Sequence, residues 1–128
     1  MALSNVCLFL GEEKYIINSK INRIIKETKA DEFNITSYDC EETNVSNAIQ
    51  DALTPPFMSD TKVVLIKRPL FLTNEKSPIN HDLKLLNSYI ESPLETTYLI
   101  IDASLLKLNE KSETVKLLRK KANVSETK

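Results

Sequence analysis

Apolar runs that resemble buried strands alternate with amphipathic segments along this 128-residue chain, and that alternation limits its fold more than any other feature. Three runs have the length and composition of buried strands, and a fourth alternates apolar with polar residues, as near a sheet edge: residues 5–10, 62–67 and 96–101, and residues 33–38. Strands that are all separated by helices pair in parallel. We therefore predict a parallel sheet with helices on both faces.

Each predicted strand is followed by a segment in which apolar residues recur at helical spacing. The four stripes are Ile17, Ile21, Ile24, Ile25 and Thr28; Val45, Ala48, Ile49, Ala52 and Leu53; Leu83, Leu86, Tyr89 and Ile90; and Val115, Leu117 and Leu118 within residues 110–121. Between residues 68 and 80, Phe71 and Leu72 are expected to pin an irregular connection onto the core. A fifth strand is expected to begin at Val124. Because the chain stops soon afterwards, we expect residues 1–128 to form one domain, a fragment of a longer multidomain protein.

The segment before the third predicted strand combines two prolines with two large apolar residues. Pro55 and Pro56 end the preceding helix, because proline lacks the backbone N–H and restricts the residue before it. Phe57 and Met58 follow at once and are held where the strand begins. Such side chains fill either the protein's own core or a pocket on a partner, and the residues by themselves leave both readings open.

A parallel α/β sheet commonly binds a nucleotide where its strands end, but this chain lacks the residues for one. The single glycine, Gly11, excludes both a P-loop and a Rossmann fingerprint, which need several glycines. Glu12 and Glu13 follow it and would repel phosphate. The third strand ends in Lys67 and Arg68, where an NTPase places acidic residues that hold magnesium. We therefore expect a degenerate nucleotide site.

Other polar residues form no recognisable catalytic or metal-binding pattern. Asp39 and Asp102 follow strands and are interpreted as turn or cap residues. His81 precedes a helix and is interpreted as a surface residue near its cap. Cys7 and Cys40 match no metal spacing and are interpreted as reduced intracellular thiols. The sequence predicts no catalytic residue, cofactor or metal, and leaves open whether the whole protein is an enzyme.

The overall charge and hydropathy favour a cytoplasmic protein that does not bind DNA or membranes strongly. The formal net charge is −1, so no global field attracts the chain to nucleic acid, and any DNA contact is expected to be indirect or weak. No apolar run approaches the ~20 residues that span a bilayer.

Three stretches, residues 6–17, 38–65 and 93–101, together resemble the N-terminal domain of the delta subunit of bacterial DNA polymerase III, a clamp-loader protein. The resemblance implies an α/β, AAA+-like domain with a mainly parallel five-stranded sheet between helices and a degenerate nucleotide site. It also implies a role in DNA replication: binding the sliding clamp (beta) and helping to open it for loading onto DNA, without ATP hydrolysis by this domain. Further regions would contact other clamp-loader subunits, within a holoenzyme that is a DNA-directed DNA polymerase.

In that family a hydrophobic pair, commonly Leu-Phe, lies just before the third strand and inserts into a pocket of the clamp. The matching positions are Pro56 and Phe57, followed by Met58. Because proline replaces the usual leucine, Phe57 is expected to carry more of the contact. In the alternative hypothesis, Phe57 and Met58 lie in the core of a structural AAA+-like scaffold that joins other loader subunits. A small nucleotide- or phosphate-dependent enzyme is the third hypothesis.

Overall fold

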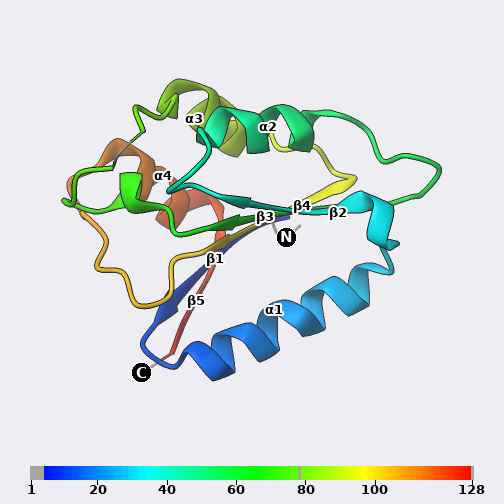
Figure 1. Ribbon diagram of the computed structural model, residues 1–128, viewed down its shortest axis with the longest axis horizontal. Coiled ribbons are helices and arrows are strands. Elements are labelled where there is room, and N and C mark those ends of the chain that lie inside the picture. Colours follow the sequence, from blue (N-terminus) through cyan, green and yellow to red (C-terminus); the bar gives the residue numbers. More distant parts are fainter. Residues whose placement is uncertain (1–4, 78, 128) are drawn as a thin grey trace.

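The computed structural model describes residues 5–77 and 79–127, which form one sheet with helices on both of its faces (Figure 1). The strands are β1 Val6–Gly11, β2 Ile35–Asp39, β3 Lys62–Lys67, β4 Thr97–Asp102 and β5 Asn123–Thr127. The α-helices are α1 Lys14–Thr28, α2 Val45–Leu53, α3 Leu83–Glu91 and α4 Glu113–Lys121. Two short 3-10 helices, η1 Glu32–Asn34 and η2 Leu70–Leu72, lie in connections.

The five strands pair in the order β2-β3-β4-β1-β5, and every pair is parallel. The predicted parallel sheet is therefore confirmed, including the strand that starts near Val124. After β1 the chain crosses past β4 and β3 to β2, at one edge of the sheet. After β4 it crosses past β1 in the opposite direction, to β5 at the other edge. This reversal places the topological switch point between β4 and β1, where such sheets usually hold a ligand.

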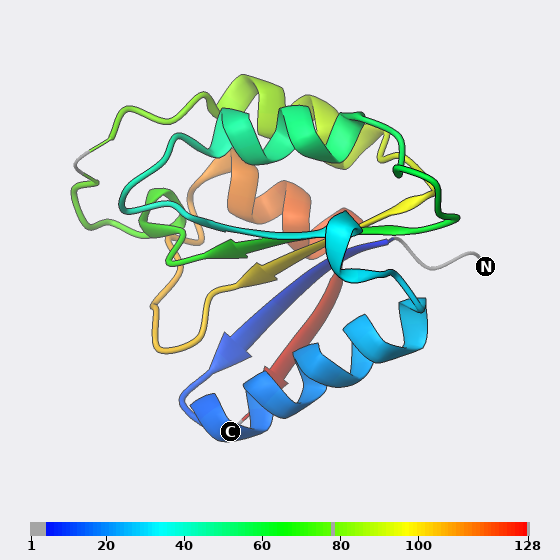
Figure 2. The same ribbon diagram turned by 45° about the vertical axis from the view of Figure 1, so that its right-hand side comes forward.

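Alternate residues of β1 enter two separate cores, as the two-residue period of a strand requires. Val6, Leu8 and Leu10 pack with residues of α2, α3 and α4. Cys7 and Phe9 point to the other face, where α1 contributes Ile17 and Ile21. Figures 1 and 2 show α1 alone on its face and the other three helices on the opposite face.

Two predicted boundaries differ from the structure by more than one residue, for local reasons. The sequence predicts Phe33 and Asn34 at the start of the second strand, but both lie in η1, and Phe33 is 81% exposed. The last helix starts at Glu113 instead of residue 110, because Ser112 caps it and accepts the Val115 N–H at 3.4 Å. In the connection before α3, Leu72 is fully buried, as predicted, whereas Phe71 is partly buried. No helix within the described residues is long and apolar enough to cross a membrane.

Gly11 is required by the close approach of β5, so replacing it by alanine should destabilise the fold. Its φ is +130°, and an added β-carbon would lie 2.1 Å from Thr127 Oγ1 and 2.6 Å from the Thr127 carbonyl oxygen. The backbone conformation alone should cost Gly11→Ala about 1–3 kcal/mol of unfolding free energy. Urea unfolding measures this loss, with Glu12→Ala at the neighbouring exposed position as the control. Equal stability of the two variants would show that β5 does not press on Gly11.

Candidate functional site

Phe57 and Met58 lie on an exposed segment, residues 54–61, which we call the corner. It joins α2 to the start of β3 and projects beyond the end of the sheet at which the strands begin (Figures 1 and 2). Phe57 is 69% exposed and Met58 is 87% exposed, whereas Pro56 is partly buried. The hypothesis that Phe57 and Met58 fill the domain's core is therefore wrong.

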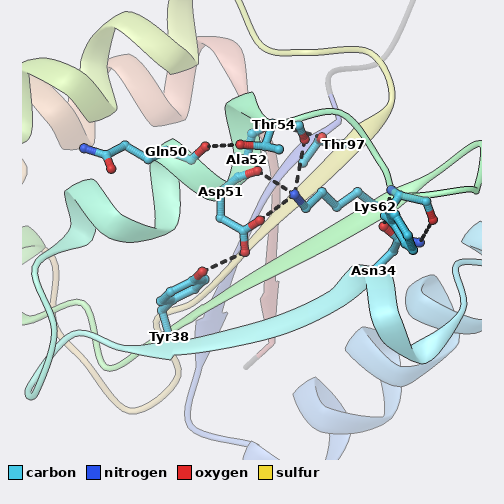
Figure 3. Close-up of polar contacts among 9 residues, drawn as sticks. Asn34, Tyr38, Gln50, Asp51, Ala52, Thr54, Lys62 and Thr97 are labelled. Atoms are coloured by element: carbon cyan, nitrogen blue, oxygen red, sulfur yellow. Dashed lines mark hydrogen bonds and ion pairs between the residues drawn. The ribbon is translucent and has the colours of Figure 1, made fainter.

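The start of the corner is fixed by a buried lysine beneath the end of α2. Lys62 is 7% exposed, and its Nζ lies 2.5 Å from Asp51 Oδ1, 2.8 Å from the Asp51 carbonyl oxygen and 3.2 Å from the Thr54 carbonyl oxygen (Figure 3). The three protons of the ammonium thus have three acceptors. A cation at this place also suits the negative end of the α2 dipole. Lys62 therefore caps the carboxyl end of α2 and anchors the first residue of the corner.

Two further side chains complete this network around the last turn of α2 (Figure 3). The Tyr38 hydroxyl donates to Asp51 Oδ2 at 2.7 Å, so both oxygens of that carboxylate are engaged. Burial, followed by the hydrogen bond and negative charge of Asp51, raises the pKa of Tyr38 to about 12. The Thr97 hydroxyl donates to the Ala52 carbonyl oxygen at 3.1 Å from the start of β4. The end of α2 is consequently tied to three strands: β2, β3 and β4.

The middle of the corner is held by one buried amide. Asn34, in η1, is 2% exposed; its Oδ1 accepts the Phe57 N–H at 2.7 Å and its Nδ2 donates to the Phe57 carbonyl oxygen at 2.9 Å. At the far end, the Thr61 hydroxyl donates to the Thr28 carbonyl oxygen at 2.8 Å. The backbone of the corner is thus fixed at its start, middle and end, while the Phe57 ring stays in solvent.

Met58 has a φ of +52°, a left-handed conformation that L-residues adopt at a cost of about 1–2 kcal/mol. The contacts on both sides of Met58 make this conformation possible. Backbone strain of this kind gathers at functional sites, where surrounding contacts maintain it.

At the opposite end of the sheet, the crevice where a nucleotide would bind is lined by an internal ion pair. A cavity of about 430 Å³ lies at the carboxyl ends of β2, β3 and β4 and the start of α1. Lys14 Nζ lies 3.0 Å from Asp102 Oδ2 and 2.9 Å from Ser104 Oγ. Burial opposes ionisation of Asp102, but hydrogen bonds from Ser104 and Lys14 outweigh it and lower the pKa of the carboxyl group. The lysine that follows the β1 turn is thereby directed to a carboxylate at the switch point.

Arg68 and Asp39, which also line this crevice, are paired with each other. Arg68, directly after β3, donates through Nε to Asp39 Oδ1 at 3.1 Å and contacts Glu41 Oε2 at 2.9 Å. Asp39 also accepts the Glu41 N–H, and Asp102 accepts the Ser104 N–H, each two residues on. The prediction that both aspartates are turn residues is confirmed, with an added role in ion pairing. Lys67 is exposed, as predicted for a strand-end charge.

His81 is half-buried and braces α2 instead of lying on the surface before α3. The Val45 N–H donates to its Nδ1 at 2.8 Å, so the neutral ring carries its proton on Nε2, which lies 3.0 Å from the Cys40 carbonyl oxygen. Cys7 and Cys40 are both free thiols. Burial raises the pKa of Cys40 to about 12 and also raises the pKa of Cys7. Within residues 5–77 and 79–127, no three metal-ligating side chains gather into a site.

The single histidine should make stability depend on pH just below neutrality. Burial lowers the pKa of His81 below its ordinary value of 6.5, so the unfolded chain binds the proton more readily than the folded chain. The stabilisation is present above pH 6.5 and should be lost as pH falls below it. Urea unfolding between pH 7 and about 5 measures the slope of the unfolding free energy against pH, in a range above the pKa of most carboxyl groups. His81→Gln should flatten the slope, and an unchanged slope would assign it to other groups.

The residues that position the corner were not identified from the sequence. Pro56, Phe57 and Met58 were found together because the two prolines mark them. Asn34 lies in a stretch that resembles a strand, and Lys62 resembles an ordinary flanking lysine. For Lys62 the one signal in the sequence is its position: it is the first strand residue after a helix that ends at prolines.

This combination of fold and site defines a class: an AAA+-like α/β domain whose nucleotide crevice is lined by ion pairs of its own side chains. The chain belongs to the DNA polymerase III delta subunit family, because the family model described as "DNA polymerase III, delta subunit" matches residues 7–128. The family resemblance seen in the sequence is confirmed.

Two Bacillus subtilis matches agree with that assignment, and one solved structure from Thermotoga maritima shares the fold. DNA polymerase III subunit delta of B. subtilis strain 168 is 37% identical over 127 residues, which cover 95% of this chain and 36% of the relative. The solved B. subtilis DNA clamp loader delta protein matches with a TM-score of 0.87 at 36% identity, over 98% of this chain and 38% of that one. A gamma subunit-related protein from T. maritima shares the fold, with a TM-score of 0.60 at 8% identity over 96% of this chain and 40% of that one. The chain thus spans a little over a third of its Bacillus relatives.

Proposed function

We propose that this domain binds the DNA sliding clamp through Phe57, with Pro56 and Met58 beside it, and helps to open the clamp for loading onto DNA during replication. The observation that carries the proposal is an aromatic ring that is 69% exposed on a backbone held by Asn34. An aromatic anchor that enters a partner's pocket is a common form of interface hot spot. The rigid corner lowers the entropy that such a contact loses on binding.

Clamp opening by this domain would need no ATP hydrolysis of its own. A protein that binds the open or strained ring more tightly than the closed ring shifts the clamp towards opening. Lys14 and Arg68 in the nucleotide crevice are engaged by Asp102 and by Asp39, which supports an ATP-independent role. Regions outside this chain would join the other clamp-loader subunits, any DNA contact would be indirect or weak, and the site of action would be the cytoplasm.

Equilibrium titration of the cognate sliding clamp with this chain tests the proposal. Saturable binding is expected, together with an unchanged melting temperature when Mg-ATP is added. Absence of clamp binding alongside binding to other loader subunits would instead favour a domain that only joins those subunits. An ATP-induced rise in melting temperature would favour a nucleotide-dependent protein.

A further inference from the structure

We propose that Asn34 is a positioning residue for the clamp contact: its amide holds the backbone of Phe57 so that the ring is presented before the clamp arrives. The inference rests on the proposed function and adds a residue outside the corner to it. Asn34 lies 23 positions before Phe57 in the chain and in a different element, η1.

The chemistry of the contact fixes which way the amide points. The Phe57 N–H requires an acceptor, and the Phe57 carbonyl oxygen requires a donor, so Oδ1 and Nδ2 of Asn34 have one consistent assignment. Asp31 strengthens it, because its Oδ1 accepts the second Nδ2 proton at 3.0 Å. The side chain thus pairs with Phe57 as a neighbouring strand would, through one donor and one acceptor.

The corner depends on this amide because its own side chains supply little apolar anchoring. Phe57 and Met58 are exposed, and so is Phe33, which adjoins Asn34 in η1. Pro56 has no N–H to donate, and Met58 occupies a left-handed backbone conformation. A buried amide would also be costly unless its hydrogen bonds were made, which favours a role in holding Phe57 over one in filling space.

Loss of the amide should therefore reduce the fraction of molecules in the binding arrangement. Apparent affinity falls in proportion to that fraction, so Asn34→Ala should weaken clamp binding about tenfold. In the Phe57→Ala background, Asn34→Ala should weaken binding no further, because the ring that it positions is already absent. Additive losses would indicate that Asn34 acts in some other way.

Asn44→Ala is a matched control for a purely structural effect. Asn44 caps the start of α2, the end of the helix away from the corner, by accepting the Ser46 N–H at 3.0 Å. It also hydrogen-bonds with the backbone of Asn80 and Asp82. Both variants lose an asparagine with several hydrogen bonds, but only Asn34→Ala touches the corner. Clamp affinity is measured well below both melting temperatures, and Asn44→Ala should bind as the wild type does.

Hydrogen exchange at the Phe57 amide separates failure of this inference from failure of the proposed function. Protection should be present in the wild type and in Asn44→Ala, and lost in Asn34→Ala. Wild-type clamp affinity and Phe57 protection in Asn34→Ala would overturn the inference alone, whereas no binding by the wild type would overturn both proposals. Should Asn34→Ala fail to fold, Asp31→Ala at an exposed position removes only the orienting acceptor and should weaken binding about threefold. Wild-type affinity of Asp31→Ala would then contradict the inference.

Discussion

Replacing Lys62 by methionine is expected to lower the free energy of unfolding by about 3–5 kcal/mol, the usual cost of removing one partner of a buried ion pair. Methionine has a similar length and no charge. It would leave the Asp51 carboxylate facing Tyr38 alone. It would also remove the Lys62 hydrogen bonds to the Asp51 and Thr54 carbonyl oxygens, of which the Asp51 oxygen keeps the Thr54 N–H. Urea unfolding followed by circular dichroism measures the loss.

Lys67→Met provides the matched control, because Lys67 lies on the same strand but is exposed. Its unfolding free energy should change by less than about 0.5 kcal/mol. The double variant Lys62→Met with Asp51→Leu should recover part of the loss, since an apolar pair needs no buried counter-charge. Equal stability of Lys62→Met and Lys67→Met would contradict the role assigned to Lys62.

Removing the Phe57 ring is expected to abolish most clamp affinity while leaving the fold intact. Truncating a hot-spot side chain costs about 2 kcal/mol or more of binding free energy. For Phe57→Ala this corresponds to a dissociation constant about thirtyfold larger. The melting temperature should hardly change, because the ring is 69% exposed in the free domain. A buried phenylalanine would instead cost about 3–5 kcal/mol of stability when replaced by alanine.

Tyr15→Ala is the control for a general loss of exposed aromatic surface. Tyr15 is 85% exposed but lies in the first turn of α1, at the carboxyl end of the sheet and away from the corner. Its clamp affinity should equal that of the wild type. Wild-type affinity in Phe57→Ala, or an equal loss in Tyr15→Ala, would show that the corner is not the contact.

The architecture was predictable because its signals are local and repeated. Buried runs such as residues 62–67 and stripes such as Ile17 and Ile21 each determine their own element, and their alternation determines a parallel sheet. The degenerate nucleotide site was equally predictable, from the single glycine and from Lys67 and Arg68 at the end of the third strand. The ion pair of the crevice could not be predicted, because Lys14 and Asp102 lie 88 residues apart in the chain.

The exposed corner was identified but its support was not. Prolines indicate where a helix ends, but they do not determine whether the following side chains point into the core or into solvent. The sequence therefore leaves the burial of Phe57 open, and the structure shows that its side chain is exposed. Asn34 and Lys62 act through contacts between elements, and their neighbours in sequence give no hint of the partners. Tertiary pairing of single polar side chains leaves no periodic pattern to read.

Hydrogen–deuterium exchange of the chain with and without the cognate sliding clamp tests the central claim most directly. Bound clamp should slow exchange at the amides of Met58 and Ser59, and should slow further the Phe57 amide that Asn34 already protects. Exchange around Lys14 and Ser104, at the other end of the sheet, should change little. Protection centred on Lys14 and Ser104, with the corner exchanging as in the free chain, would contradict the proposal that the corner is the clamp-binding site.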